Sequence, residues 1–439
     1  MGGFVPSGER EKREMLEAVG LTSMEELYAD IPSDVKIDSL DLPEGMGEME
    51  TLEQMETLAD KNCVFRSIFR GAGAYDHYIP SIVKAVASKE EFVTAYTPYQ
   101  AEVSQGILQS IFEYQTMICQ LTGMDVSNAS VYDGATAAAE AAAMCRDRKR
   151  SKVLIAENAH PHVVETIKTY CMGADAEWEA IPTKDGRLDE AALAELLEDK
   201  SVACVYVQQP NFYGLLEDCA ELGTLIHKSG AKFIMGCNPI SLAVIKSPAE
   251  CGADIAVGEG QPLGMSLSFG GPYLGYMAST KALMRKLPGR IVGQTVDARG
   301  QRAFVLTLQA REQHIRREKA SSNICSNQAL CALTAGAYMT AMGKAGLTEV
   351  AEQCLSKAHY LAAKLTETEG IEMAYSGEFF HEFVTTCPVD SSLLLNALER
   401  EGILGGYPVK NGILWCATEK NTKAEIERLV GIVRKIVRG

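Results

Sequence analysis

From residue 152 onward, short runs of consecutive apolar residues alternate with longer segments of helical character. A run that is apolar at every position is typical of a strand buried on both faces, as in a parallel sheet flanked by helices. Segment 216–230 is one of the helices expected between these runs. The expected strands are 152–156, 202–207, 231–236, 254–258 and 273–278. This alternation predicts an α/β fold with a large, mostly parallel sheet.

The segment before this sheet predicts two helices. Apolar residues between positions 102 and 121 recur in alternating steps of four and three residues, which is the helical period. Gly123 follows directly and is a suitable C-cap. A second helix is expected to begin near Gly134 and to end in the basic run 146–150, whose charges suit a helix C-terminus.

The two ends of the chain depart from the strand–helix alternation. Residues 7–32 predict two short helices, the second beginning after Thr22 or Ser23, and 69–81 is a loop rich in glycine and aromatic residues. After about residue 300 two helices are expected, and then a strand–helix–strand–helix tail; the segments are 327–343, 348–367, 379–386, 392–401, 412–418 and 423–437. We therefore expect an N-terminal helical arm and loop segment (1–94), a large α/β domain (95–300) and a smaller C-terminal α/β domain (301–439).

Charge and cysteine content restrict the class of protein. The formal net charge of −16 disfavours nucleic acid or an anionic membrane surface as a partner. No apolar run approaches the roughly eighteen residues of a membrane span, and the first residues lack the apolar core of a signal peptide. The thirteen cysteines are an odd number and include no C-x-x-C pair. We therefore expect reduced thiols in a globular cytoplasmic protein.

Polar residues follow several expected strands, and ligands bind at the carboxyl ends of strands in open α/β sheets. The helix N-terminus after Asp133, which includes Thr136, could hold a phosphate, although simple helix capping by Asp133 is the better explanation of this motif taken alone. Other polar residues follow the first three strands, and none of them indicates a specific function when it is taken alone. They are His160, His162, Asn211 and Asn238.

A lysine is missing where the combined pattern leads one to expect it. Neither lysine nor arginine occurs from Ser247 to Thr280. The polar positions together resemble the layout of fold-type I pyridoxal phosphate (PLP) enzymes, in which a lysine in such a window bonds the cofactor. The matching positions are Thr136 (phosphate turn), His160 (ring stacking), Asn211 (phenolic oxygen) and Asn238 (in place of an aspartate). Because an amide cannot keep the pyridine nitrogen protonated, the resemblance implies that these are vestigial cofactor positions.

Long strings of the sequence resemble the P-proteins of the glycine cleavage system. The run from Ala95 reads AYTPYQAEVSQGILQSIFEYQTMICQLTGMDVSNASVYDGATAAAEA, and other matching segments are 257–278, 287–330, the tail from Phe379 and the N-terminal REMLEAVGLTSMEELYADIP. In many bacteria this family is split into two chains, and the sequence matches the N-terminal half, called subunit 1 or alpha. The resemblance implies a fold-type I PLP-dependent transferase-like fold.

The family resemblance also implies the chemistry and the partners. The cofactor is PLP, which subunit 2 binds covalently through its lysine, so this chain contributes no catalytic residue of its own and no metal ligand. The partners implied are P-protein subunit 2, the lipoylated H-protein and the substrate glycine. Together the subunits decarboxylate glycine and transfer its aminomethyl group to the lipoyl arm.

The resemblance further implies a substrate and cofactor pocket shared with the partner subunit. The residues expected there are Tyr96, Thr97, Tyr99, Gln100, Gly270 and Gly271. Without the resemblance, the YTPYQ segment is equally well a plain turn with packed tyrosines. Even with the resemblance, the glycine pair is equally well a tight turn before a strand.

Two other hypotheses remain open at this point. The chain could anchor PLP through Lys246 or Lys281, although both are badly spaced from Asn238. Alternatively, it could be a free-standing pseudoenzyme with a binding or regulatory role.

Overall fold

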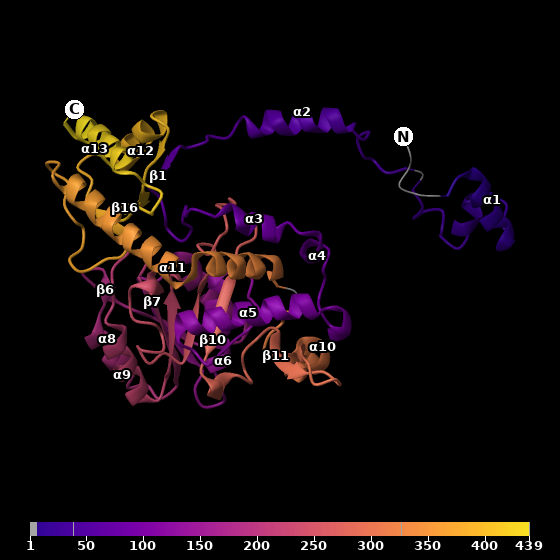
Figure 1. The fold of residues 1–439 in the computed structure, drawn as a ribbon, viewed down its shortest axis with the longest axis horizontal. Helices are drawn as coiled ribbons and strands as arrows, with labels where there is room; N and C mark the ends of the chain where they lie inside the picture. Colours follow the sequence, from indigo (N-terminus) through magenta and orange to yellow (C-terminus); the bar gives the residue numbers. More distant parts are fainter. Residues whose placement is uncertain (1–6, 38, 326, 439) are drawn as a thin grey trace. The chain divides into compact units, whose positions relative to one another are not determined.

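The computed structural model describes residues 7–37, 39–325 and 327–438. Residues 1–6, on which part of the signal-peptide argument rests, lie outside these ranges. Residue contacts divide the chain into two units, Met1–Val64 and Phe65–Gly439, which are described separately (Figure 1). The boundaries expected at 94/95 and 300/301 stay predictions.

The first unit contains short helical elements with no buried side chain among them. They are α1 (Glu9–Ala18), the 3-10 turn η1 (Glu25–Tyr28) and α2 (Glu48–Ala59). The second expected helix of this region is therefore only a single turn. The Thr22 backbone N–H and hydroxyl both donate to the Glu26 carboxylate, and Pro32 ends the segment soon afterwards.

The second unit is built on a seven-stranded sheet with the order β2-β10-β9-β8-β7-β3-β4. Neighbours from β9 to β4 are parallel, whereas β10 is antiparallel to both β9 and β2. The strands are β2 (Val126–Ser127), β3 (Lys152–Ala156), β4 (Trp178–Ile181), β7 (Val202–Gln209), β8 (Lys232–Cys237), β9 (Ile255–Glu259) and β10 (Gly275–Ser279). The predicted large, mostly parallel sheet is confirmed.

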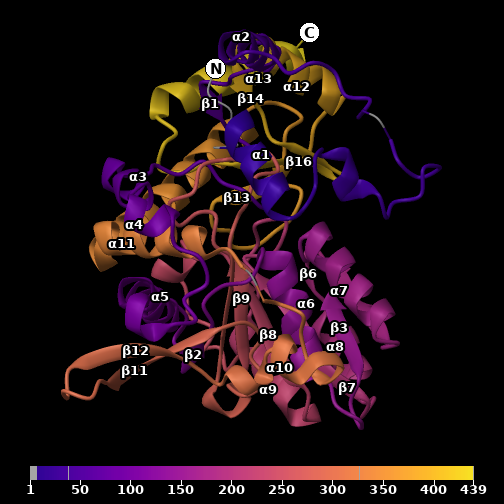
Figure 2. The ribbon, with the colours of Figure 1, turned by 90° about the vertical axis from the view of Figure 1, so that its right-hand side faces the viewer.

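Helices cover both faces of this sheet, which explains the apolar runs of its central strands (Figure 2). Leu154 packs on the face covered by α5, α9 and α11, while Val153 and Ile155 pack against α6 and α7. The covering helices are α3 (Ser81–Ala87), α5 (Gln105–Thr122), α6 (Gly134–Cys145), α7 (Pro161–Gly173), α8 (Glu190–Leu196) and α9 (Cys219–Ser229). Gly123 caps α5 in the left-handed conformation, as expected. The basic run 146–150 follows α6 and does not form its last turn.

A long helix, α11 (Ala329–Thr366), leads from the sheet to the C-terminal part of the chain. It covers both segments expected as separate helices, and Gly343 interrupts it with φ 60° and ψ −176°. That conformation is accessible almost only to glycine, so the sequence marks the kink. The first-half residue Ala335 packs on the large core, whereas the second-half residue Leu361 belongs to the C-terminal core.

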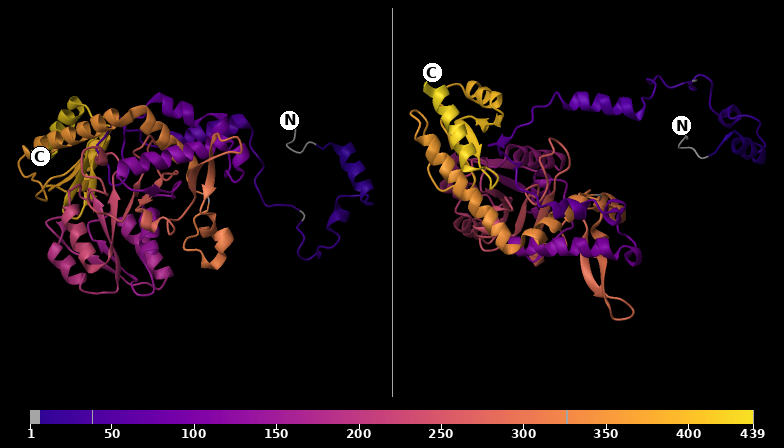
Figure 3. Two further views of the ribbon diagram at one scale, coloured as in Figure 1. Left: turned by 60° about the horizontal axis from the view of Figure 1, so that its bottom comes forward. Right: turned by 45° about the horizontal axis from the view of Figure 1, so that its top comes forward.

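The C-terminal part is a small α/β layer with its own core (Figure 3). Its elements are β13 (Glu382–Thr385), α12 (Ser391–Arg400), β14 (Ile403–Leu404), β15 (Tyr407–Val409), β16 (Gly412–Cys416) and α13 (Lys423–Arg438). The N-terminal strand β1 (Ser67–Ile68) pairs in parallel with β14, and the adjacent Phe69 is buried in this core. The expected strand–helix–strand–helix tail is therefore present, with an early segment added to it.

Shorter elements connect these layers. The hairpin β11 (Ile291–Val296) and β12 (Arg302–Thr307) projects from the large sheet, as Figure 3 shows. The others are α4 (Glu90–Val93), η2 (Ala101–Val103), β5 (Thr183–Lys184), β6 (Arg187–Leu188), η3 (Ser241–Ala243), η4 (Lys281–Leu283), η5 (Gln309–Arg311), α10 (Gln313–Arg316) and η6 (Arg317–Lys319).

Two general expectations can be compared with the structure. No helix in the described ranges is long and apolar enough to cross a membrane. All thirteen cysteines are free thiols, and most of them are buried, where they pack as small apolar side chains. The cytoplasmic location stays a prediction.

Candidate functional site

A cavity of about 570 Å³ lies at the carboxyl ends of the parallel strands. This is where open α/β sheets bind ligands. Its walls come from the loop 71–75, the N-termini of α6 and α7, the ends of β7, β8 and β9, and the beginning of β13. The lining residues with polar side chains include Tyr75, Asp133, His160, His162, Gln208, Asn238, Glu259, His381 and Glu382.

The described part of the cavity wall lacks the two side chains that are always cationic. Among the described residues that line it, there is neither lysine nor arginine. Lys246 and Lys281, the two lysines that flank the empty window of the sequence, are both exposed and do not line the cavity. Neither is therefore placed to bond a ligand there.

One wall is formed by the glycine- and aromatic-rich loop, which buried side chains hold in place. The Glu382 carboxylate accepts from the Ala72 N–H at 2.6 Å and from the Tyr75 hydroxyl at 2.7 Å. Gln261 bonds the Tyr75 backbone at both its N–H (2.8 Å) and its carbonyl (2.9 Å). Burial raises the pKa of Glu382 to about 7, although the Ala72 and Tyr75 bonds oppose the shift.

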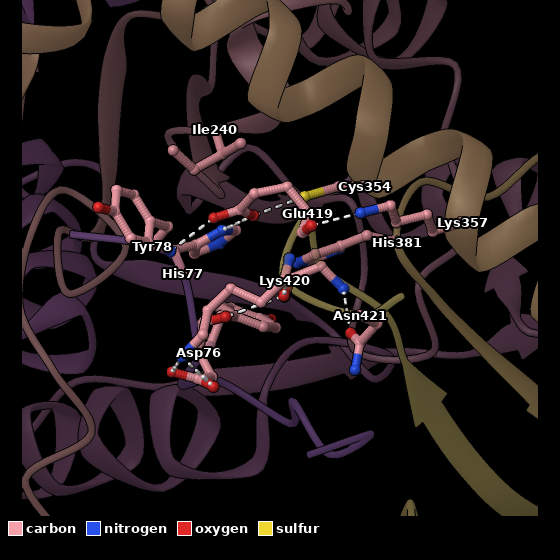
Figure 4. Close-up of polar contacts among 12 residues, drawn as sticks. Asp76, His77, Tyr78, Ile240, Cys354, Lys357, His381, Glu419, Lys420 and Asn421 are labelled. Atoms are coloured by element: carbon pink, nitrogen blue, oxygen red, sulfur yellow. Dashed lines mark hydrogen bonds and ion pairs between the residues drawn. The ribbon is translucent and has the colours of Figure 1, made fainter. Parts of the chain in front are cut away.

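The same loop is fastened to the C-terminal domain by a second carboxylate, Glu419 (Figure 4). Its oxygens bind His77 Nδ1 at 2.7 Å and the Tyr78 N–H at 2.6 Å, and the Cys354 thiol donates to it at 3.4 Å. Lys420 pairs with Asp76 beside this cluster at 2.7 Å. Burial opposes ionisation of Glu419 and is the largest single effect, but the contacts with His77 and with backbone N–H groups together outweigh it, so the pKa of Glu419 is lowered.

The cluster of His77, Cys354 and Glu419 brings together residue types that bind metals. One ligand atom from each lies within 4.8 Å of the others. However, the Glu419 carboxylate already accepts hydrogen bonds from the other two, and burial, followed by the Glu419 charge, raises the pKa of the Cys354 thiol well above its usual range. A thiol must lose its proton to bind a metal. We therefore interpret the cluster as a latch that holds loop 69–81 in place.

The opposite wall is the N-terminus of α6, where the half-buried carboxylate of Glu259 lies. Asp133 caps the helix by accepting from the Thr136 N–H at 2.7 Å. The Glu259 carboxylate, at the end of β9, accepts from the N–H groups of Gly134, Gln261 and Leu274, each at 3.0 Å. These bonds favour the ionised form, but burial is the larger effect and raises the pKa of Glu259 to about 7.

The four positions expected to be vestigial do not all face the cavity. His160 and Asn238 lie in its wall, where His160 Nε2 lies 3.0 Å from the Ala72 carbonyl and Asn238 Nδ2 lies 3.3 Å from His381 Nε2. Thr136 does not line the cavity. Asn211 is buried elsewhere, and its Nδ2 donates to Gly186 and Glu217. The structure thus brings two of the four positions together.

The positions expected to form a shared pocket lie outside this cavity. Tyr96 is 82% exposed and Tyr99 is 50% exposed, and the adjacent Thr97 and Gln100 are half-buried and exposed, respectively. The Tyr99 hydroxyl accepts from the buried Arg290 at 3.1 Å, and the guanidinium lies over the tyrosine ring.

The glycine pair lies in a tight turn that presents an aromatic side chain. Gly271 N–H donates to the Ser268 carbonyl at 2.9 Å, and Gly270 has a φ of 101°. Phe269 has a φ of 45° and is 90% exposed. A bulky residue with positive φ that also faces solvent is strained and poorly buried, which suggests a partner for this turn.

Sequence reasoning missed the carboxylates that organise the cavity. Glu259 falls in the string GEGQ, which drew attention only because it lacks a lysine, and Glu382 falls inside an expected strand. A glutamate at the end of an otherwise apolar strand, flanked by two glycines, is a usable signal for Glu259. Glu382 and its distant partner Tyr75 carry no comparable local signal.

The residues present do not fit a lysine-linked PLP. No described residue of the cavity wall supplies an amine, Asn238 follows β8 in place of an acid, and the helix N-terminus suited to a phosphate is filled by Glu259. The cofactor-related positions in this chain are therefore incomplete, although the cavity itself is retained.

The fold and the position of the cavity define the class of protein. Alanine–glyoxylate aminotransferase from Nostoc sp. superposes with a TM-score of 0.60 at 16% identity, covering 92% of this chain and 98% of that one. The chain thus has the fold of fold-type I PLP-dependent enzymes. The family model described as glycine cleavage system P-protein matches residues 3–433, and the chain belongs to this family.

Individual relatives are similar to this chain over nearly its whole length. A protein of Moorella thermoacetica named "Probable glycine dehydrogenase (decarboxylating) subunit 1" is 50% identical over 443 residues, covering 99% of both chains. A protein of Carboxydothermus hydrogenoformans with the same name is 50% identical over 440 residues, covering 98% of this chain and 99% of its own. The crystal structure of glycine decarboxylase (P-protein) of the glycine cleavage system, in inhibitor-bound form, has a TM-score of 0.94 at 42% identity and covers 99% of this chain and 100% of that one.

Proposed function

We propose that this chain is the lysine-free subunit of a two-chain glycine decarboxylase. With subunit 2 it decarboxylates glycine and passes the aminomethyl group to the lipoyl arm of H-protein. Membership of the P-protein family and the "subunit 1" names of full-length relatives support this proposal. The free-standing pseudoenzyme is not favoured by these relatives.

One observation supports the assignment of the cofactor to subunit 2 and not to this chain: no lysine or arginine lines the cavity among the described residues. A cavity whose described lining residues include no lysine cannot hold PLP covalently, so we assign the cofactor to subunit 2. There PLP supplies the electron sink needed for loss of the glycine carboxylate. This chain contributes binding surface and positioning.

The exposed YTPYQ and Phe269–Gly271 segments are the parts of this chain that we assign to the shared pocket. They do not line this chain's own cavity, and Tyr96 and Phe269 are more than four-fifths exposed. Apolar and aromatic residues left in solvent are typical of surfaces that a partner covers. Stable heteromeric assemblies commonly bury more than about 2,000 Å².

The test is co-expression with a lysine-bearing subunit 2, followed by a glycine–bicarbonate exchange assay in the presence of lipoylated H-protein. We expect exchange from the complex and none from either chain alone. Exchange by this chain alone with added PLP would contradict the proposal. So would two chains that elute separately at micromolar concentration.

A further inference from the structure

The Glu259 side chain binds three separate segments of the chain through one carboxylate. Oε2 accepts from the Gly134 N–H at the start of α6, and Oε1 accepts from the Gln261 and Leu274 N–H groups. Both oxygens are therefore used, and the donors come from the helix N-terminus, the segment that follows β9 and the residue before β10.

The N-terminus of a helix attracts an anion because its first N–H groups have no partner within the helix and its dipole is positive there. Phosphate groups of ligands bind at such positions in many α/β proteins. In α6, Asp133 takes the Thr136 N–H and Glu259 takes the Gly134 N–H. The helix thus receives its anions from the chain itself.

The surroundings also oppose a second anion. A Cβ on Gly134 would come within 2.7 Å of the Glu259 backbone nitrogen, so helix and strand are already as close as their backbones permit. Asp133 lies in the same wall, and no lysine or arginine lines the cavity in the described part of the chain. A phosphate would meet two carboxyl groups and no ammonium or guanidinium.

We propose that Glu259 keeps phosphate-bearing ligands out of this subunit by acting as the anion that the N-terminus of α6 would otherwise take from a phosphate. The inference deepens the proposed function and rests on it, because it makes Glu259 a residue that directs the cofactor to subunit 2. Glu259 is a specificity-determining residue in this sense, and not a catalytic one.

The test compares binding of inorganic phosphate, PLP and phosphate-free pyridoxal to the full-length chain at about pH 8, where Glu259 is largely ionised. Thermal unfolding and isothermal titration are measured for the natural chain, Glu259→Ala and Glu259→Gln. We expect Glu259→Ala to bind phosphate and PLP about ten- to thirtyfold more tightly than the natural chain. Pyridoxal should show no such gain.

Glu382→Ala is the matched control, because Glu382 is a buried glutamate in the same cavity wall but binds the 72–75 loop. It should gain no phosphate affinity. If Glu259→Ala folds only when phosphate is present, that rescue supports the proposal. The volume-conserving Glu259→Gln variant should gain affinity to a lesser degree.

Two results would overturn the inference. One is saturable phosphate or PLP binding by the natural chain with the affinity of the variants. The other is a lack of phosphate-dependent stabilisation in both Glu259 variants. Neither measurement uses catalysis, so an inactive two-chain complex would refute the proposed function and leave this inference to be judged separately.

Discussion

Two regions of this chain differ in how far their side chains are paired within the chain. One is the cavity, and the other comprises the exposed YTPYQ and Phe269–Gly271 segments. In the cavity, each oxygen of Glu259 accepts a backbone hydrogen bond, and Glu382 and Gln261 fix the loop opposite. In the exposed segments, aromatic side chains face solvent, and Phe269 adopts a positive φ. The polar groups of the cavity are paired within the chain, whereas the surface that we assign to the partner subunit leaves aromatic side chains exposed.

This difference shows that the presence of a cavity at the usual position in the fold does not by itself indicate that the chain binds a ligand there. The cavity follows from the fold, since strand ends and helix N-termini meet there in any open α/β sheet. Which polar groups are already paired decides whether a ligand can replace them. By this criterion the exposed segments, and not the cavity, are where substitutions should affect activity.

The largest effect is expected from removing a hydroxyl in the exposed segment. Tyr96→Phe or Tyr99→Phe in the two-chain complex should lower exchange activity by about 10²–10³, the usual cost of losing a hydrogen bond made in the transition state. The melting temperature should stay nearly unchanged for Tyr96→Phe. It should fall for Tyr99→Phe, because the buried Arg290 loses the hydroxyl to which it donates. Tyr407→Phe, a partly exposed tyrosine in β15, is the control and should retain activity. Unchanged activity in both variants would remove these tyrosines from the site.

The cavity side of the comparison predicts a pH dependence of stability. Burial raises the pKa of Glu259 and of Glu382 from about 4.5 to about 7. The folded chain then binds more protons than the unfolded chain between these values, so the free energy of unfolding falls as pH rises through this window. Each group contributes up to about 1.4 kcal/mol per pH unit.

Urea unfolding at pH 5 to 8 measures this slope. Glu259→Gln and Glu382→Gln should each flatten it, because an amide does not titrate. Glu113→Gln, on the exposed side of α5, should leave it unchanged. Slopes that are identical in all variants would show that neither carboxyl holds its proton in the folded state.

A smaller effect is expected from the exposed turn. Phe269→Ala should weaken association with subunit 2 by about 2 kcal/mol, or roughly thirtyfold in Kd, if the ring is a central anchor of the interface. Sedimentation or titration of the two purified chains measures this change. Met172→Ala on α7, where the side chain is 79% exposed, is the control and should associate normally. An equal loss in both variants, or none for Phe269, would contradict the assignment.

The smallest expected effect concerns the cavity, where we expect no covalent attachment of PLP. When the isolated chain is incubated with PLP, reduced with borohydride and digested, no peptide should carry stoichiometric pyridoxyl-lysine. The reason is that no lysine lines the cavity among the described residues. A single stoichiometric site, at Lys246, Lys281 or elsewhere, would reverse the comparison and make the cavity a working cofactor site.

Much of the fold could be predicted from sequence because its signals are local. Runs of apolar residues buried on both faces identified β3, β7, β8 and β9 to within two residues, and Gly123 marked the end of α5. The two expected helices 327–343 and 348–367 are one kinked helix, since one glycine interrupts it without a loop. The antiparallel direction of β10 had no signal in its own composition, because direction depends on its neighbours.

The candidate site was predictable only in outline. A missing lysine is visible in the sequence, and so are the polar residues after the strands. Pairings such as Glu382 with Tyr75, 307 residues apart, depend on how two distant segments meet. Asn211 follows a strand as expected, yet its amide turns to Glu217, because a buried carboxylate nearby competes for it.

The pairing of β1 with β14 has a consequence for how the chain is made. Phe69 donates its N–H to Leu404 and accepts from the Cys416 N–H, while the Ser67 hydroxyl binds Glu425, 358 residues later. During synthesis, residues 67–69 leave the ribosome early but find their partners only when the last helix has been translated. The C-terminal core can therefore close only after α13 has been translated, and such distant closure is slow. Until then, an apolar segment of the nascent chain stays open to chaperones.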